Sequence, residues 1–108
     1  MNTSTLSALA EPNRLRIVEL LRDGPRPVGE IADRLVLRQP QVSKHLRVLS
    51  EAGLVEVHPA AQQRIYQLQA QPFVELEDWL ETFRRIWEKR LDSLEEYMQE
   101  LKDKSNQE

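Results

Sequence analysis

The sequence predicts a mainly α-helical protein with one small β-hairpin. Up to residue 52, apolar residues recur every three or four positions, which indicates helices with one buried face. Over residues 54–68 apolar and polar residues alternate, as in two half-buried strands, and from residue 72 the helical period returns. With 108 residues and 40% apolar content, the chain suits one small domain with a modest core.

Three helices are expected before residue 36. The first lies near Leu6–Leu9, and Pro12 opens the second, which ends at Asp23–Pro25 because Gly and Pro favour a turn there. Pro27 starts the third helical segment. The apolar residues Leu15, Val18 and Leu21 recur every three positions in the second helix. In the third, Val28, Ile31, Ala32 and Leu35 follow the spacing of a helix with one buried face.

A fourth helix, expected over residues 39–52, follows the third after only three or four residues. Pro40 suits its first turn, and Gly53 suits the left-handed position just past its end. On a helical wheel Val42, Leu46 and Leu49 form one arc and should pack inward. Two helices joined by so short a turn form a helix-turn-helix arrangement, in which the second helix reads DNA.

The outer face of this fourth helix is basic. Lys44 and Arg47 lie opposite the apolar arc, and residues 38–50 contain no acidic residue. The whole chain has a net charge of −3, but residues 1–70 are net +2 and residues 71–108 net −5. The front of the chain can therefore present a positive surface to phosphates, because exposed charges more than about 10 Å away are screened.

The alternating segments, residues 54–58 and 64–68, predict two strands joined by a loop over residues 59–63. A β-hairpin that follows a helix-turn-helix is called a wing. Its tip offers the polar side chains Gln62, Gln63 and Arg64.

The last segment predicts one long helix over residues 72–103. At 1.5 Å per residue it would reach about 45 Å, more than a domain of this size covers by itself. A second copy of the chain is therefore expected to cover the rest, as a homodimer. The residues expected at the dimer interface are Leu6, Leu9, Phe73, Leu76, Trp79, Leu80, Phe83, Trp87, Leu91 and Leu94.

Taken together, these segments predict a single winged helix-turn-helix domain over residues 1–108. Its expected parts are an N-terminal dimerisation helix at 1–11, a helical core with the helix-turn-helix at 12–53, the β-hairpin wing at 54–69 and a C-terminal dimerisation helix at 72–103.

The chain contains no cysteine, which excludes disulfides, thiolate metal sites and cysteine nucleophiles. No stretch approaches the roughly 18 apolar residues of a membrane span, and residues 1–5 lack the pattern of a signal peptide, so a cytoplasmic protein is expected. Glycine-rich phosphate loops, nucleophile–base sets and metal-ligand spacings are also absent from the sequence. We therefore expect neither an enzyme nor a cofactor.

Three separated patches resemble the ArsR/SmtB family of bacterial winged helix-turn-helix repressors. They are Ser43–Leu49 with Glu51–Val55, Leu9–Arg14 before the second helix, and Arg64–Tyr66 leaving the wing. The resemblance covers most of the chain. It implies a homodimer that blocks transcription by occupying an operator, and it admits a small-molecule inducer that releases the DNA.

The resemblance places DNA-reading residues at the start of the recognition helix. Gln39 and Gln41 have amide groups that can pair with adenine edges, whereas basic residues can contact phosphates. Because a two-fold dimer presents two recognition helices about one DNA turn apart, the operator should be an imperfect palindrome. The expected DNA-binding residues are Arg38, Gln39, Pro40, Gln41, Ser43, Lys44, Arg47, Gln62, Gln63 and Arg64.

Two positions depart from the family pattern. Val36 stands in a turn where relatives usually carry Gly, and a β-branched residue tolerates a left-handed conformation badly, so the turn is expected to be wound differently. Arg38 replaces a Ser ahead of the recognition helix, which removes a capping hydroxyl and adds a cation near the phosphates.

Metal sensing is not expected. The paired cysteines of the arsenic- and lead-sensing relatives would fall at Pro27 and Gly29, and residues 71–108 contain no histidine for a zinc site of the other type. Carboxylates alone favour hard cations. His45 is expected to pack or to contact a phosphate, and His58 to be an exposed hairpin residue.

Two other interpretations stay open. A winged helix can also serve as a protein-interaction module without DNA binding, and the acidic second part of the chain is compatible with that role. Some aromatic residues of the last helix could line an inducer pocket rather than pack in a dimer. These aromatics are Trp79, Phe83, Trp87 and Tyr97.

Overall fold

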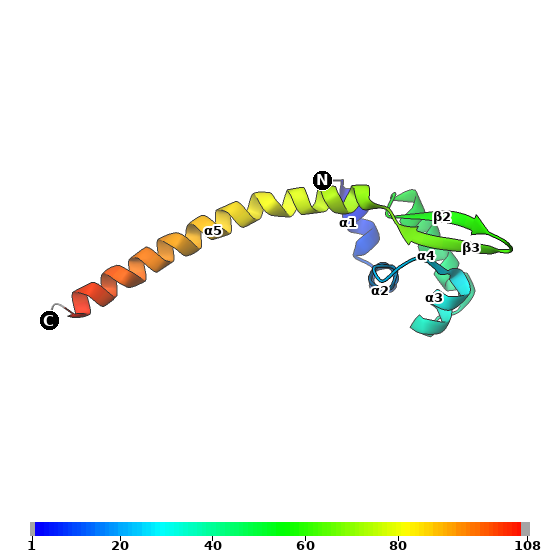
Figure 1. Cartoon of the computed structure of the whole chain (residues 1–108), viewed down its shortest axis with the longest axis horizontal. Coiled ribbons are helices and arrows are strands. Elements are labelled where there is room, and N and C mark those ends of the chain that lie inside the picture. Colours follow the sequence, from blue (N-terminus) through cyan, green and yellow to red (C-terminus); the bar gives the residue numbers. More distant parts are fainter. Residues whose placement is uncertain (1, 107–108) are drawn as a thin grey trace. The chain divides into compact units, whose positions relative to one another are not determined.

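The computed structural model describes residues 2–106. The contacts between residues divide the chain into two compact units, residues 1–75 and 76–108. The helices and strands of the described residues are α1 Thr3–Leu9, α2 Pro12–Leu21, β1 Arg26–Pro27, α3 Val28–Leu35, α4 Gln39–Glu51, β2 Val55–Ala60, β3 Gln63–Leu68 and α5 Ala70–Asn106 (Figure 1). The predicted fold class, mainly helical with a small β-hairpin, is therefore confirmed.

The first unit has one core, formed where α2, α3, α4 and the start of β2 meet. The arc predicted for the recognition helix is confirmed, because Val42, Leu46 and Leu49 are fully buried. At about 25 cal/mol per Å² of buried apolar surface, such side chains supply most of the stability of a small domain. The other buried apolar side chains are Ala8, Ile17, Val18, Leu21, Ile31, Ala32, Leu54 and Val55.

The helix ends follow the predicted residues. The Glu11 side chain caps α2 by accepting a hydrogen bond from the Arg14 backbone N–H at 2.8 Å, and Pro12 occupies the first turn. After α4, Gly53 adopts a φ of 77°, and Leu54 N–H donates to the Leu49 carbonyl at 2.9 Å. This left-handed glycine turns the chain from α4 directly into β2.

The hairpin is longer and more tightly closed than predicted. Pro59 and Ala60, expected in a five-residue loop, belong to β2, and the turn consists of Ala61 and Gln62 alone. Pro59 is tolerated because β2 is an edge strand, where a missing N–H does not interrupt a second ladder. Ala61 has a φ of 55°, the left-handed sign that two-residue hairpin turns require.

A third strand was not predicted. β1 is only two residues long and pairs antiparallel with β3, Arg26 with Tyr66 and Pro27 with Ile65. The sheet order is β1-β3-β2, so β3 lies in the middle. Two residues are too few to show an alternating pattern, and their extended form depends on the partner strand.

The expectation for Val36 was wrong. Val36 adopts the left-handed conformation, with φ 55° and ψ 50°, so the turn between α3 and α4 keeps the geometry that glycine would favour. Leu37 N–H donates to the Ala32 carbonyl at 3.0 Å, which closes the end of α3. The packing of the two helices imposes this turn, and the β-branched side chain is 88% exposed within it.

The helix α5 starts two residues before Pro72 and continues to Asn106, 37 residues in all. At 1.5 Å per residue it is about 55 Å long. From Trp79 onward its large apolar side chains are between 37% and 60% exposed. Trp79 and Phe83 stack edge to face, with ring centroids 5.1 Å apart. Among the described residues, no helix combines the length and apolarity that crossing a membrane requires.

Candidate nucleic-acid interface

The outer face of α4 is a row of exposed polar and basic side chains. Lys44 and Arg47 lie on it, one and two turns from the helix start. The buried arc on the other side holds the helix in place, so this face is presented by a rigid element. The predicted DNA-binding residues of α4 that the structure places in an exposed position are Gln39, Pro40, Gln41, Ser43, Lys44 and Arg47. Their contact with DNA stays a prediction.

The start of α4 is only lightly capped. Arg38 occupies the N-cap position in an extended conformation, and its side chain makes no capping hydrogen bond, as expected for a residue without a short acceptor. Instead, Gln41 Oε1 accepts a hydrogen bond from Arg38 N–H at 3.4 Å. The same end of the helix has a shallow hollow of about 350 Å³ lined by Arg38, Pro40, Gln41 and Lys44. Free backbone N–H groups and two cations thus lie together at the helix start, an arrangement that favours anions.

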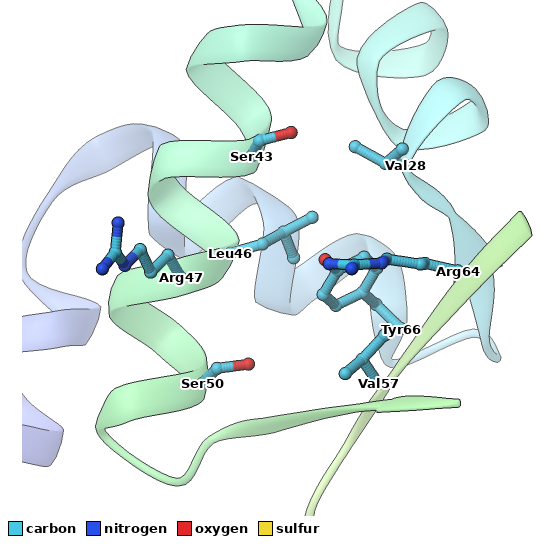
Figure 2. Close-up of a pocket in the computed structure, with 8 residues that line it drawn as sticks. All are labelled: Val28, Ser43, Leu46, Arg47, Ser50, Val57, Arg64 and Tyr66. Atoms are coloured by element: carbon cyan, nitrogen blue, oxygen red, sulfur yellow. The ribbon is translucent and has the colours of Figure 1, made fainter. Parts of the chain in front are cut away.

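A second hollow lies between α4 and the wing. It has a volume of about 440 Å³, and its walls come from α4 on one side and from the hairpin on the other. Figure 2 shows Ser43 and Ser50 pointing from α4 toward the hairpin. The lining residues are Val28, Ser43, Leu46, Arg47, Ser50, Val57, Arg64 and Tyr66.

Ser50, which lines this hollow, was not among the DNA-binding residues predicted from the sequence. It lies seven residues after Ser43, two helical turns along the same side, so helical spacing from Ser43 could have identified it. With hydroxyl groups from Ser43 and Ser50 and a guanidinium from Arg64, the groove between α4 and the wing offers donors to phosphate oxygens.

Arg47 has a partner on its own helix. Its Nε lies 3.4 Å from Glu51 Oε1, and both side chains are largely exposed. An exposed pair at this spacing contributes only a few tenths of a kcal/mol, so Arg47 can exchange Glu51 for a phosphate at little cost. In Figure 2 the guanidinium of Arg47 turns away from Ser43 and Ser50.

The predicted wing residues lie at the end of the hairpin. Gln62 is in the turn, whereas Gln63 and Arg64 begin β3, and all three are exposed. Arg64 pairs with Pro59 across the strands and lines the groove. The structure therefore brings Arg64 beside α4. Gln62 and Gln63 lie nearer the tip of the hairpin and are not among the residues that line the groove.

His45 and Glu11 connect the recognition helix to the start of α2. His45 Nδ1 lies 3.7 Å from Glu11 Oε2, and both side chains are partly buried. Arg14 extends this cluster, since its Nε donates to the Ala8 carbonyl at 2.7 Å and so satisfies the end of α1. The patch Leu9–Arg14, one of the three that resemble the family, thus lies at the junction of α1, α2 and α4.

Arg16, which lies beside the turn before α4, was also not predicted from the sequence. Its Nη2 donates to the Leu35 carbonyl at 3.0 Å, the last carbonyl of α3 beside the Val36 turn, and its Nη1 to Asn13 Oδ1 at 3.3 Å. Arg16 is exposed and adds a cation next to the turn that leads into α4. No local pattern identifies it, because its partner is 19 residues away.

The outer face of the wing carries a polar network around Glu56. Its carboxylate accepts hydrogen bonds from Gln67 and, at 3.2 Å, from Gln69, and lies 3.1 Å from His58 Nε2. The hydrogen bond from Gln67, followed by the contacts with His58 and Gln69, lowers the pKa of Glu56 from 4.5 to about 2. His58 is an exposed hairpin residue, as predicted. Within residues 2–106, no group of three or more His, Asp or Glu side chains could hold a metal ion.

The predicted dimer-interface residues fall into two groups. Leu9 and Phe73 are half-buried and pack against the core of the first unit, and Leu6 is 37% exposed. Leu76 is half-buried. The others on α5 are exposed apolar side chains: Trp79, Leu80, Phe83, Trp87, Leu91 and Leu94. Their contact with a second copy stays a prediction.

Comparison with known proteins relates this site to a family. A family model described as a helix-turn-helix domain matches residues 9–58. The HTH-type transcriptional regulator Rv2034 of Mycobacterium tuberculosis is 51% identical over 61 residues, which cover 56% of this chain and 57% of that protein. The chain thus spans little more than half the length of this relative. The transcriptional activator HlyU of Vibrio cholerae is 35% identical over 82 residues, 76% of this chain and 73% of that protein.

Solved structures extend the similarity beyond the helix-turn-helix. The transcriptional repressor BigR from Xylella fastidiosa has a TM-score of 0.62 and 33% identity, with 75% of this chain and 83% of that chain covered. A homodimeric winged helix-turn-helix DNA-binding domain from Mycobacterium bovis, described as a possible ArsR-family regulator, has a TM-score of 0.65 and 27% identity, with 76% of each chain covered. The chain therefore belongs to the ArsR/SmtB family of winged helix-turn-helix transcriptional regulators, and it lacks the cysteines of the metal-sensing members.

Proposed function

We propose that the protein is a DNA-binding transcriptional repressor that acts as a homodimer on a palindromic operator. Family membership supports regulation rather than catalysis, and the related BigR is a repressor. Because DNA is the target, the protein would act in the cytoplasm. The predicted residues of α4 and the wing are the proposed contacts.

The observation that carries the proposal is the outer face of α4. It is free of acidic side chains from residue 38 to residue 50, while its other face is fully buried at Val42, Leu46 and Leu49. The 13 residues of α4 form a rod about 20 Å long. The major groove of DNA is about 12 Å wide and admits one such helix. Lys44 and Arg47 would then face phosphates, and Gln39 and Gln41 base edges.

The test is the affinity for DNA from the promoter of the protein's own operon, measured at two salt concentrations. Binding should weaken steeply with salt, because each neutralised phosphate releases counterions. Lys44→Ala should lower the affinity and reduce the slope of log K against log salt by about 1, since it removes one phosphate contact. Gln39→Ala should mainly relax sequence preference. Arg22→Ala, which removes an exposed cation at the end of α2, is the charge-matched control.

Three results would contradict the proposal. Binding that ignores salt, or no binding, would favour the protein-interaction module. An equal loss of affinity in Lys44→Ala and Arg22→Ala would show that net charge, rather than the face of α4, is responsible.

The homodimer and the palindrome are tested separately. Sedimentation should give twice the mass of the 12.7 kDa chain, and a footprint should show two half-sites about one DNA turn apart. The sign of regulation is tested with a promoter reporter, whose output should rise when the gene is deleted. A fall in reporter output would instead identify an activator, and the relative HlyU is named a transcriptional activator. A compound that releases the DNA in the binding assay would identify the inducer that the family resemblance admits.

A further inference from the structure

Two helices of this chain end in the same kind of turn, but with different residues at its left-handed position. At the end of α4 this residue is Gly53, and the N–H of Leu54 donates to the carbonyl five residues earlier at 2.9 Å. At the end of α3 it is Val36, and the N–H of Leu37 donates to the carbonyl five residues earlier at 3.0 Å. The same turn is thus built once on a residue that favours it and once on a β-branched residue that does not.

The valine turn receives a side-chain hydrogen bond from another helix. Arg16 lies on α2, and its Nη2 donates at 3.0 Å to the carbonyl of Leu35, the residue directly before Val36. Its Nη1 donates at 3.3 Å to Oδ1 of Asn13, which lies on the same helix and orients the guanidinium. Carbonyls in the last turn of a helix lack partners within that helix, and a cation is favourable at this end. Arg16 therefore stabilises the turn at the carbonyl that precedes its left-handed residue.

The same turn determines where the recognition helix begins. The helix α4 starts at Gln39, three residues after Val36, and its first turn carries the proposed base contacts Gln39 and Gln41. Leu37, directly after Val36, is partly buried against the core. If Val36 moved to a negative φ, which valine favours, Leu37 would leave the core and the first turn of α4 would shift. Only the closed, left-handed turn keeps the first turn of α4 in its place.

We propose that Arg16 is a positioning residue for DNA binding, because it holds the turn at Val36 closed and so fixes the first turn of α4. The inference rests on the proposed function for the DNA. It adds a residue of α2, outside the recognition helix and the wing, on which binding depends. Because Arg16 acts through the strained turn, Val36→Gly should compensate for its loss. A phosphate contact by Arg16 would not be compensated in this way, since glycine cannot replace a lost cation.

Binding titrations with promoter DNA compare the wild type, Arg16→Ala, Val36→Gly and the double variant. Arg16→Ala should lower the affinity about two- to fivefold, because fewer free molecules have the closed turn. The double variant should return to near the wild-type affinity, and the slope of log K against log salt should be the same in all four proteins. Arg22→Ala, which removes an exposed cation at the end of the same helix, is the charge-matched control and should bind like the wild type.

Nuclear magnetic resonance tests the turn without DNA. The nuclear Overhauser effect between the N–H and Hα of one residue is strong at positive φ, because the two hydrogens are then close together. Arg16→Ala should weaken this signal at Val36. Ala61 has the same φ of 55° in the wing turn, so its signal is the matched control within the same molecule and should not change. If Arg16→Ala does not fold, Arg16→Lys replaces it, since lysine keeps the charge but lacks the planar fork that reaches two acceptors.

Four results would overturn the inference. The first is an unchanged Val36 signal in the Arg16 variant. The second is a loss of affinity that Val36→Gly does not restore, with the salt slope reduced by about 1, which would make Arg16 a phosphate contact. The third is an equal loss of affinity in Arg22→Ala, which would assign the effect to net charge. The fourth is wild-type affinity in the Arg16 variant, which would refute this inference and leave the proposed function in place.

A wild-type protein that binds no DNA would refute the proposed function and, with it, the role of Arg16 in binding. The resonance experiment would still decide whether Arg16 holds the turn, because it uses the free protein. The two failures are therefore distinguishable.

Discussion

Replacing Val36 with glycine should stabilise the protein. Val36 has φ 55° and ψ 50°, and a non-glycine residue in this left-handed region costs about 1–2 kcal/mol, with β-branched residues at the upper end. The side chain is 88% exposed, so Val36→Gly removes almost no packing. Glycine in turn raises the entropy of the unfolded chain, which costs about 0.5–1 kcal/mol. The net effect is a gain of about 1 kcal/mol.

The assay is urea and thermal unfolding at one fixed protein concentration, because the stability of a dimer depends on concentration. A gain of about 1 kcal/mol raises the melting temperature of a domain of this size by about 4 °C. Val36→Ala is the control. It removes the β-branch but keeps Cβ, and should therefore recover only a small part of the gain. A Val36→Gly variant no more stable than Val36→Ala would refute the reasoning, since it would show that the left-handed turn stores no strain.

Three further predictions concern the core, the recognition face and the wing. Leu46→Ala should lower the free energy of unfolding by about 2–5 kcal/mol, measured by urea denaturation, because Leu46 is fully buried on the inner face of α4; a smaller loss would contradict its place in the core. Glu51→Gln should raise the affinity for DNA about twofold in a binding titration, since it removes an acid beside Arg47; unchanged affinity would place Arg47 outside the contact. The pKa of Glu56 is lowered in the folded state, so its stabilising effect is present above about pH 4.5 and is lost as the pH falls toward about 2. Urea unfolding between pH 3 and 7 should show this dependence in the wild type and a weaker one in Glu56→Gln; equal slopes would contradict it.

Local sequence patterns determined the helices and the face of α4. The spacing of Val42, Leu46 and Leu49 decides which side of the helix is buried, because 3.6 residues per turn leave no other common face. The ends of α4 follow from Pro40 and Gly53, whose backbone preferences act within a few residues. These features depend on neighbours in the chain, so sequence reasoning could identify them.

Tertiary contacts decided the rest of the candidate site. Ser50 and Arg64 face one groove only because the hairpin lies beside α4, and Arg16 reaches the end of α3 across 19 residues. The strand β1 exists only where β3 supplies its hydrogen-bond partners. These arrangements depend on residues distant in sequence, which a local pattern does not encode.

Val36 shows the difference between the two levels most clearly. By itself a valine favours a negative φ, and the sequence accordingly pointed to a different turn. In the folded chain α3 and α4 are both anchored by buried side chains, so the short segment between them has to reverse direction at Val36. The burial of two helix faces outweighs about 1–2 kcal/mol of backbone strain at one exposed residue, and the turn that leads into the recognition helix is set by packing rather than by its own residue.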